Sequence, residues 1–308
     1  MTTCLICDGV VTKVPSPGSV LAISIVVFLC VVALLWDASR RGARWVATLL
    51  GGILFGEIVE ALNVNNVLGS GCHSYCYPSV GPAIFGVPLW VPVGWGGIIY
   101  AAAWTAQRLR IHWFARAITA AFLAVSIDFS LDPVATLLGF WTWDAPKTNF
   151  LGVPYDNFAA WFLVVLIYAA TTAYFLRTWK PKSIALQVGT VLLCELIAVA
   201  ALIGVVWVMT TVFKYSPRGR DGHIAAGVFM LALATGVVGT LIHVRIPRPP
   251  NPKVLPVNWV VLVVPVVMHL TSYALYFELA RWQEPTALVA AIPLQLLAGV
   301  FVFAQPWL

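Results

Sequence analysis

The sequence is poor in charged residues: only 10% of its 308 residues are Asp, Glu, Lys or Arg, whereas soluble domains contain about 25%. Apolar residues make up 61% of the chain. This shortage of charge excludes a soluble globular protein. The 18 basic residues lie in short segments between apolar runs, where they orient membrane helices, so the net charge of +6 does not indicate binding to nucleic acid.

The sequence also lacks a repeat of fixed period, a low-complexity segment and a soluble domain, which favours a single membrane domain over residues 1–308. About 20 apolar residues cross a bilayer as a helix. The apolar runs therefore predict an all-α polytopic bundle of eight to nine transmembrane helices. Nine runs lie at about 19–36, 45–65, 83–104, 113–134, 158–176, 184–212, 223–244, 257–277 and 285–304.

The first run follows a polar segment without the features of a signal peptide, so we expect it to be retained as a helix. A Pro-rich linker at 246–256 is predicted to separate seven helices from the last two. Twelve of the 18 basic residues fall in loops on one side of this arrangement. The positive-inside rule then places the N-terminus outside a multi-pass protein of the bacterial inner membrane, although the loop 214–220 argues locally against it.

Carboxylates are scarcer still, and several lie inside apolar runs. Of 12 acidic residues, Glu57 and Glu60 are three apart in one run, and Asp128 and Asp132 are four apart in another. Each spacing puts both carboxyls on one helical face. A carboxylate in hydrocarbon costs on the order of 3 kcal/mol, so we expect both pairs to face the bundle interior.

No Lys or Arg lies at comparable depth except Arg116, near the start of its run, so ion pairs cannot neutralise these acids. Close carboxyls in a dry site favour one protonated and one ionised member, which suits acid–base chemistry. The alternative is that these acids cap helices or bind neighbouring backbone. Glu195 has no acidic partner on its face, and we leave it outside the predicted site.

Aromatic and turn-forming residues are concentrated next to both acidic pairs, in segments 71–95 and 128–161. Their rings either form a belt at the membrane interface or stabilise a cation in a dry site by about 2 kcal/mol or more. Gly52 and Gly56 predict a close contact of the first acidic helix with a neighbour. The candidate rings are Tyr75, Tyr77, Trp95, Trp141, Trp143 and Trp161.

The order of these motifs over about residues 50–165 resembles the carotenoid biosynthesis membrane-protein family, which includes carotenoid 1,2-hydratases and bisanhydrobacterioruberin hydratases. The resemblance makes 45–165 the motif-bearing half and 166–308 the remaining bundle. The matching residues are Glu60, Tyr75, Tyr77, Gly81-Pro82, Gly86-Val87-Pro88, Asp128, Asp132-Pro133, Trp141, Trp143, Gly152-Val153-Pro154, Asn157-Phe158 and Trp161. The sequence departs from the family pattern at Cys72, His73, Ser74, Cys76 and Ala160.

The resemblance implies hydration of a terminal C=C of an acyclic carotenoid or related isoprenoid, within the membrane lipid and without a cofactor. Asp132 and Glu60 are the expected acid and base, in an order that the sequence leaves open. Asp128 and Glu57 are expected to support them, Asn157 to orient water, and the aromatic rings to bind the substrate and shield a carbocation.

Two other functions use the same residue types. Proton-initiated cyclisation or isomerisation of an isoprenoid needs the same acid and the same cation-stabilising rings. A proton-coupled transporter also carries intramembrane acids. Broken helices at matching positions in two halves would favour transport, but Gly-Pro interruptions occur only in the first half of this sequence.

Five residues near the N-terminus and after the second run offer thiol and imidazole groups on the predicted outer side: Cys4, Cys7, Cys72, His73 and Cys76. We favour one or two disulfides, because the predicted side is oxidising. Free thiols and a zinc site are the alternatives.

Overall fold

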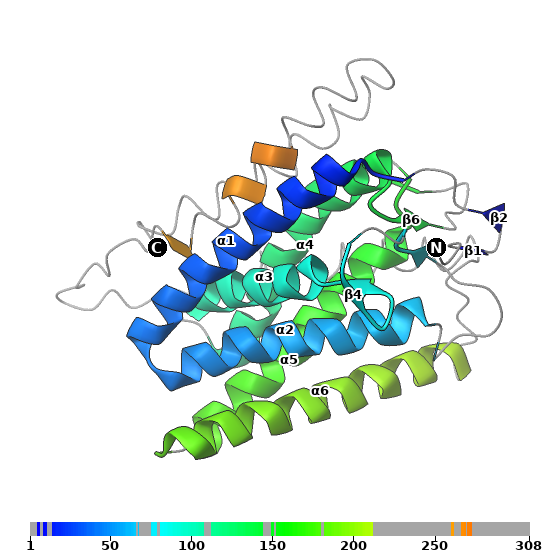
Figure 1. Cartoon of the computed structure of the whole chain (residues 1–308). Helices are drawn as coiled ribbons and strands as arrows, with labels where there is room; N and C mark the ends of the chain where they lie inside the picture. Colours follow the sequence, from blue (N-terminus) through cyan, green and yellow to red (C-terminus); the bar gives the residue numbers. More distant parts are fainter. Residues whose placement is uncertain are drawn as a thin grey trace, which may run out of the picture.

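The structure is a computed structural model and describes residues 5–6, 9–10, 14–65, 67, 75–78, 81–107, 112–143, 149–150, 152–179, 182–211, 260–261, 266–268 and 270–272. This part is mostly helical, as predicted (Figure 1). Its helices are α1 (Pro17–Arg41), α2 (Ala43–Val64), α3 (Trp90–Gln107), α4 (Trp113–Leu138), α5 (Tyr155–Trp179) and α6 (Ile184–Thr211).

Five of these helices, α1, α2, α4, α5 and α6, are long and apolar enough to cross a membrane. The chain is therefore treated as a helical membrane protein. The predicted runs 223–244 and 285–304 and the Pro-rich linker lie outside the described residues, and only short helical pieces of 257–277 are described. The predicted total of nine helices is thus not confirmed within the described part.

Helix α3 lies at the centre of the described bundle, where it packs against α1, α2 and α4 (Figure 1). Helix α5 packs against α4, and α6 packs against α2 and α5. Ile99 and Tyr100 of α3 are fully buried. The sequence of α3 has no charged residue and is rich in Gly, Ala and Trp, which suits a helix surrounded by other helices.

Glycines let α2 and α3 approach closely, which confirms the predicted helix contact. A β-carbon at Gly52 would lie 3.2 Å from the α-carbon of Gly96 in α3. At Gly56 it would lie 2.5 Å from the β-carbon of Trp95. Any side chain at Gly56 would push Trp95 away, so this crossing fixes the distance between the two helices.

The predicted helix over 83–104 is wrong at its start. Residues Ala83–Ile84 (β4) and Val87–Pro88 (β5) form an antiparallel hairpin instead, and the helix begins only at Trp90. Phe85 and Gly86 both have positive φ, at 47° and 86°, as a two-residue hairpin turn requires. Asn65 at the end of α2 donates from its amide to the Phe85 carbonyl at 2.8 Å and so ties the hairpin to α2.

Short strand pairs close the same end of the bundle. Strand β3 (Tyr75–Cys76) pairs antiparallel with β6 (Thr142–Trp143), so that Tyr75 stands opposite Trp143. Strands β1 (Leu5–Ile6) and β2 (Gly9–Val10) also pair, and β1 lies against β3. The β3–β6 pair carries the aromatic segments across the ends of the acidic helices.

Candidate active site

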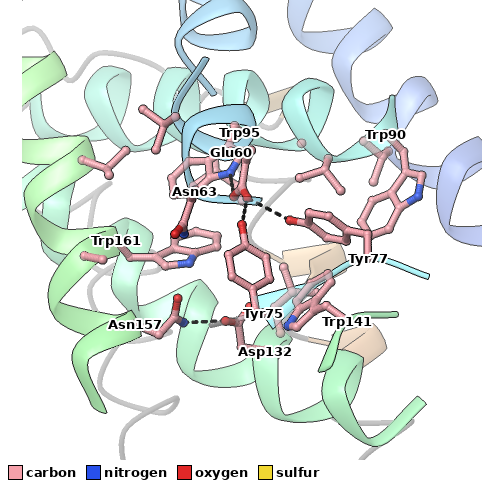
Figure 2. A pocket seen from close by; sticks show the side chains of 18 of the residues that line it. Glu60, Asn63, Tyr75, Tyr77, Trp90, Trp95, Asp132, Trp141, Asn157 and Trp161 are labelled. Atoms are coloured by element: carbon pink, nitrogen blue, oxygen red, sulfur yellow. Dashed lines mark hydrogen bonds between the residues drawn. The ribbon is translucent and has the colours of Figure 1, made fainter. Parts of the chain in front are cut away.

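Glu60, in the last two turns of α2, accepts hydrogen bonds from three side chains (Figure 2). The hydroxyl groups of Tyr75 and Tyr77 both donate to Oε2, the latter at 3.0 Å. The indole N–H of Trp95 in α3 donates to Oε1 at 2.8 Å. Glu60 is only 8% exposed, so these donors replace water around its carboxyl group.

The two tyrosines lie outside the membrane-spanning helices and remain protonated donors. Burial, reinforced by the neighbouring Glu60 carboxyl, raises the pKa of Tyr75 and Tyr77 well above the ordinary value for a phenol. Both phenols therefore keep their protons at neutral pH. They can therefore donate to Glu60 at neutral pH.

Asp128 and Asp132 form a second acidic centre, in α4. The amide of Asn157, in the first turn of α5, donates to Asp132 Oδ2 at 2.5 Å and to Asp128 Oδ2 at 3.2 Å. One amide group therefore brings the two carboxyls close to each other. Both are almost completely buried, with 0% and 2% exposure for Asp128 and Asp132.

The two acidic centres face one cavity of about 80 Å³. Figure 2 shows Glu60 on one side of this cavity and Asp132 with Asn157 on the other. The structure brings nine of the predicted site residues to its wall: Glu60, Tyr75, Tyr77, Trp95, Asp132, Trp141, Trp143, Asn157 and Trp161.

The predicted aromatic residues pack on one another around this cavity. Tyr75 stacks on Trp143 with 4.5 Å between the ring centroids, and Trp95 lies 4.1 Å from Trp161. Tyr77 meets Trp141 edge-on at 6.0 Å. These mutual contacts hold the rings together in the wall of the cavity.

Two predicted residues lie away from the cavity wall. Asp128 does not line the cavity and contacts the lining residue Asn157. Glu57 lies close enough to Glu60 to interact electrostatically, but neither of its oxygens has a hydrogen-bond partner in the described part of the chain. Among the lining residues that the sequence analysis did not include are a ring and an amide, those of Trp90 and Asn63. Asn63 is three residues from Glu60, so the helical spacing used for the acids would have found it; Trp90 is five residues from Trp95, and that spacing does not connect them.

Comparison with known proteins identifies the family of the chain. Residues 19–217 match the model of the family described as carotenoid biosynthesis protein, which is more than half of the chain. The chain belongs to the carotenoid biosynthesis protein family. No curated protein and no solved structure matches it.

Membership of the carotenoid biosynthesis protein family confirms the resemblance seen in the sequence and indicates a role in carotenoid biosynthesis. The matched residues include the whole described cavity wall except Met268. An apolar, aromatic cavity in a membrane bundle is compatible with a hydrophobic substrate of that pathway.

Of the five predicted thiol and imidazole residues, only Cys76 lies in the described part of the chain. Cys76 is disulfide-bonded, with a partner outside the described residues, which agrees with the disulfide that the sequence favoured and takes this thiol out of a zinc site. Cys4, Cys7, Cys72 and His73 lie outside the described residues. Among the described residues no cluster of His, Cys, Asp and Glu has the composition of a metal site.

Proposed function

We propose that this protein adds water to a terminal, trisubstituted C=C of a linear carotenoid or a related isoprenoid. The observation that supports this reaction is the pair of acidic centres, Glu60 and Asp132, on opposite sides of one small cavity with aromatic walls. Hydration of an isolated alkene needs a proton donor, a stabilised cation, a water molecule and a proton acceptor. The cavity residues supply the two proton-transfer groups and the cation-stabilising rings.

The hydrogen-bond partners of the two centres suggest which one is the acid. One amide donates to both Asp128 and Asp132, so the two carboxyls lie close together, and two close carboxyls in a buried site favour one protonated member. Asn157 donates to both and holds the pair together. Asp132 is the member at the cavity wall, and we assign it the role of general acid.

The surroundings of Glu60 differ from those of the aspartate pair. All three of its side-chain contacts come from donors, so its two oxygens act as acceptors and need no proton of their own. Such a group suits the general base that takes a proton from water. The bond from Trp95 and those from the two tyrosines fix the direction of its oxygens.

The reaction then balances without a redox step. The proton of Asp132 adds to the less substituted carbon of the double bond, and the π electrons form the new C–H bond, which leaves a tertiary carbocation. The oxygen of a water molecule bonds to that cation while Glu60 accepts a water proton. Transfer of a proton from Glu60 back to the aspartate pair restores the site, and the product is a tertiary alcohol.

The aromatic wall and the size of the cavity fit this sequence of steps. A cation over the face of a Trp or Tyr ring is stabilised by about 2 kcal/mol or more in a desolvated site. The buried indole N–H groups of Trp90, Trp141 and Trp143 have no acceptor among the described residues, and they suit a water molecule or the new hydroxyl group. A cavity of about 80 Å³ has room for water, since a water molecule needs about 10–15 Å³ on this measure.

Expression of the chain in a strain that makes linear carotenoids tests the proposal, with mass analysis of the extracted pigments. We expect a product one water heavier than its polyene. Asp132→Asn should lower product formation by about 10²–10⁴-fold, the usual contribution of a general acid. Glu195→Gln is the matched control, because Glu195 is a buried acid of α6 that does not line the cavity.

Full activity of Asp132→Asn would contradict the proposed acid. A product of unchanged mass would instead assign cyclisation or isomerisation to this cavity, since both conserve the atoms of the substrate. Proton flux through liposomes without any change of the pigment would favour the transporter.

A further inference from the structure

A second cavity, of about 410 Å³, lies at the opposite end of the bundle and has three arginines in its wall. Arg44 is in the first turn of α2, Arg116 in the first turn of α4 and Arg177 in the last turn of α5. At about 1.5 Å per residue, the stretch of α2 from Arg44 to Glu60 spans roughly 24 Å. This arginine cavity is therefore separate from the candidate active site.

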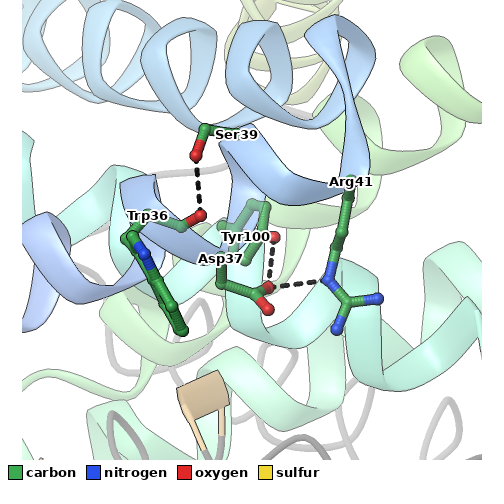
Figure 3. A network of polar contacts seen from close by, with 5 residues as sticks. All are labelled: Trp36, Asp37, Ser39, Arg41 and Tyr100. Atoms are coloured by element: carbon green, nitrogen blue, oxygen red, sulfur yellow. Dashed lines mark hydrogen bonds and ion pairs between the residues drawn. The ribbon is translucent and has the colours of Figure 1, made fainter.

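The positive charge of the arginine cavity is not neutralised within the described part of the chain. None of its three arginines forms an ion pair with a described carboxylate. Neighbouring Arg41 behaves differently, because its Nε lies 2.8 Å from Oδ2 of Asp37, and the same oxygen accepts from Tyr100 at 2.7 Å (Figure 3).

Two polar atoms in the wall of the arginine cavity are also unsatisfied. Arg116 Nε and Thr172 Oγ1 are buried and have no hydrogen-bond partner among the described residues. Leaving a buried donor without an acceptor is costly, and more so for a charged group. An anion with several acceptor oxygens would remove both deficits.

The helix ends add to this preference for an anion. Helices α2 and α4 both begin at the arginine cavity, so their positive dipole ends point towards it. Gly42, the N-cap of α2, provides no side-chain cap for the first N–H groups. Uncapped N–H groups at a helix start bind anions such as phosphate.

The remaining wall of the arginine cavity is apolar, with the rings of Trp45 and Trp113, the side chain of Leu176 and several alanines. A ligand that fits this wall has an anionic head and an apolar body. We propose that the arginine cavity binds the phosphate group of an anionic bilayer phospholipid, with Arg44 and Arg116 as its main partners. A basic pocket between transmembrane helices at the membrane surface recognises such head groups, and the guanidinium fork fits phosphate oxygens.

Native mass spectrometry of the full chain in neutral detergent tests this proposal by titration with phosphatidylglycerol or phosphatidylcholine. We expect phosphatidylglycerol to bind at least about fivefold more tightly, and Arg44→Gln and Arg116→Gln each to weaken that binding about fivefold. Lys182→Gln is the matched control, since Lys182 is an exposed cation close to the start of α6 and does not line the cavity. We expect it to change the affinity by less than about twofold.

Arg116→Lys keeps the charge but loses the planar fork, and provides a milder variant of the same contact. It should fall between the wild type and Arg116→Gln. Equal binding of the two lipids, or an equal loss in Lys182→Gln and Arg116→Gln, would overturn the proposal. Saturation by inorganic phosphate at micromolar concentration would overturn the lipid assignment, because it would identify a soluble phosphate compound as the ligand.

Discussion

The two ends of the bundle contain opposite chemistry. The end with β3 and β6 holds Glu60 and the aspartate pair among aromatic rings, and no described Lys or Arg lines its cavity. The other end holds Arg44, Arg116 and Arg177, and no described Asp or Glu lines its cavity. The difference shows that burial alone does not define a site, since both cavities contain buried polar groups; their partners decide what each can do.

At the acidic end every carboxyl of the cavity has hydrogen-bond donors supplied by the protein itself. Glu60 has three, and Asp132 has the amide of Asn157. At the arginine end, Arg116 Nε and Thr172 Oγ1 have no hydrogen-bond partner in the described part of the chain, and the three arginines form no ion pair there. The acids of the first cavity already have hydrogen-bond donors from the protein, which suits proton transfer to a neutral hydrocarbon. The arginines of the second cavity have no described carboxylate partner, which suits binding of a charged ligand.

Of the variants that follow, we expect Glu60→Gln to lower activity most. The substitution removes the proposed base at the acidic end and keeps the shape of the side chain. Hydration should fall by about 10²-fold or more, because water then has no proton acceptor at the cation. Pigment extracts of cells that express equal amounts of each variant provide the measurement. Glu57→Gln, one turn away on α2, should reduce hydration by less than about tenfold, since Glu57 does not line the cavity. Equal losses in the two variants would refute the distinct role of Glu60.

Glu57 and Glu60 also show how far the sequence predicts the site. Residues three apart on a helix differ by about 60° in direction, and residues four apart by about 40°. Both spacings count as one face in a sequence, yet of each acidic pair only one member, Glu60 in α2 and Asp132 in α4, lines the cavity. The choice depends on the rotation of each helix against its neighbours, which the spacing does not contain.

The helices and the Gly52–Gly56 contact could be predicted because apolar runs and small residues have a direct physical signal. The pairing of β3 with β6 could not, because two strands of two residues show no periodicity. That pairing places Tyr75 beside Trp143 although 68 residues separate them in the sequence. The hairpin at Phe85 could not be predicted either, because a non-glycine residue rarely adopts the positive φ that this turn needs.

The close crossing of α2 and α3 at Gly56 holds Trp95 against Glu60. Gly56→Ala places a methyl group 2.5 Å from the β-carbon of Trp95, so α3 must move or Trp95 must turn. We expect a loss of about 1–3 kcal/mol in the free energy of unfolding, as overpacking usually causes. Because the bond from Trp95 to Glu60 is strained at the same time, hydration should fall about tenfold.

Thermal unfolding in detergent and the pigment assay measure both effects of Gly56→Ala. Gly189→Ala in α6 is the control, because a β-carbon there would meet nothing within 4 Å. It should leave activity unchanged and raise stability by up to about 1 kcal/mol through helix propensity. Wild-type stability and activity in Gly56→Ala would show that the crossing tolerates a wider separation.

The smallest effect is expected at the arginine end, from Asp37→Asn. Asp37 neutralises Arg41 and accepts from Tyr100, which joins the end of α1 to α3. The substitution keeps the size of the side chain but removes its charge, so stability should fall by about 1–2 kcal/mol. The hydrated product should form at the wild-type rate, since Asp37 does not line the active-site cavity. If hydration instead fell as far as in Glu60→Gln while the protein stayed folded, the two ends would be coupled, and the separation of proton transfer from anion binding would be wrong.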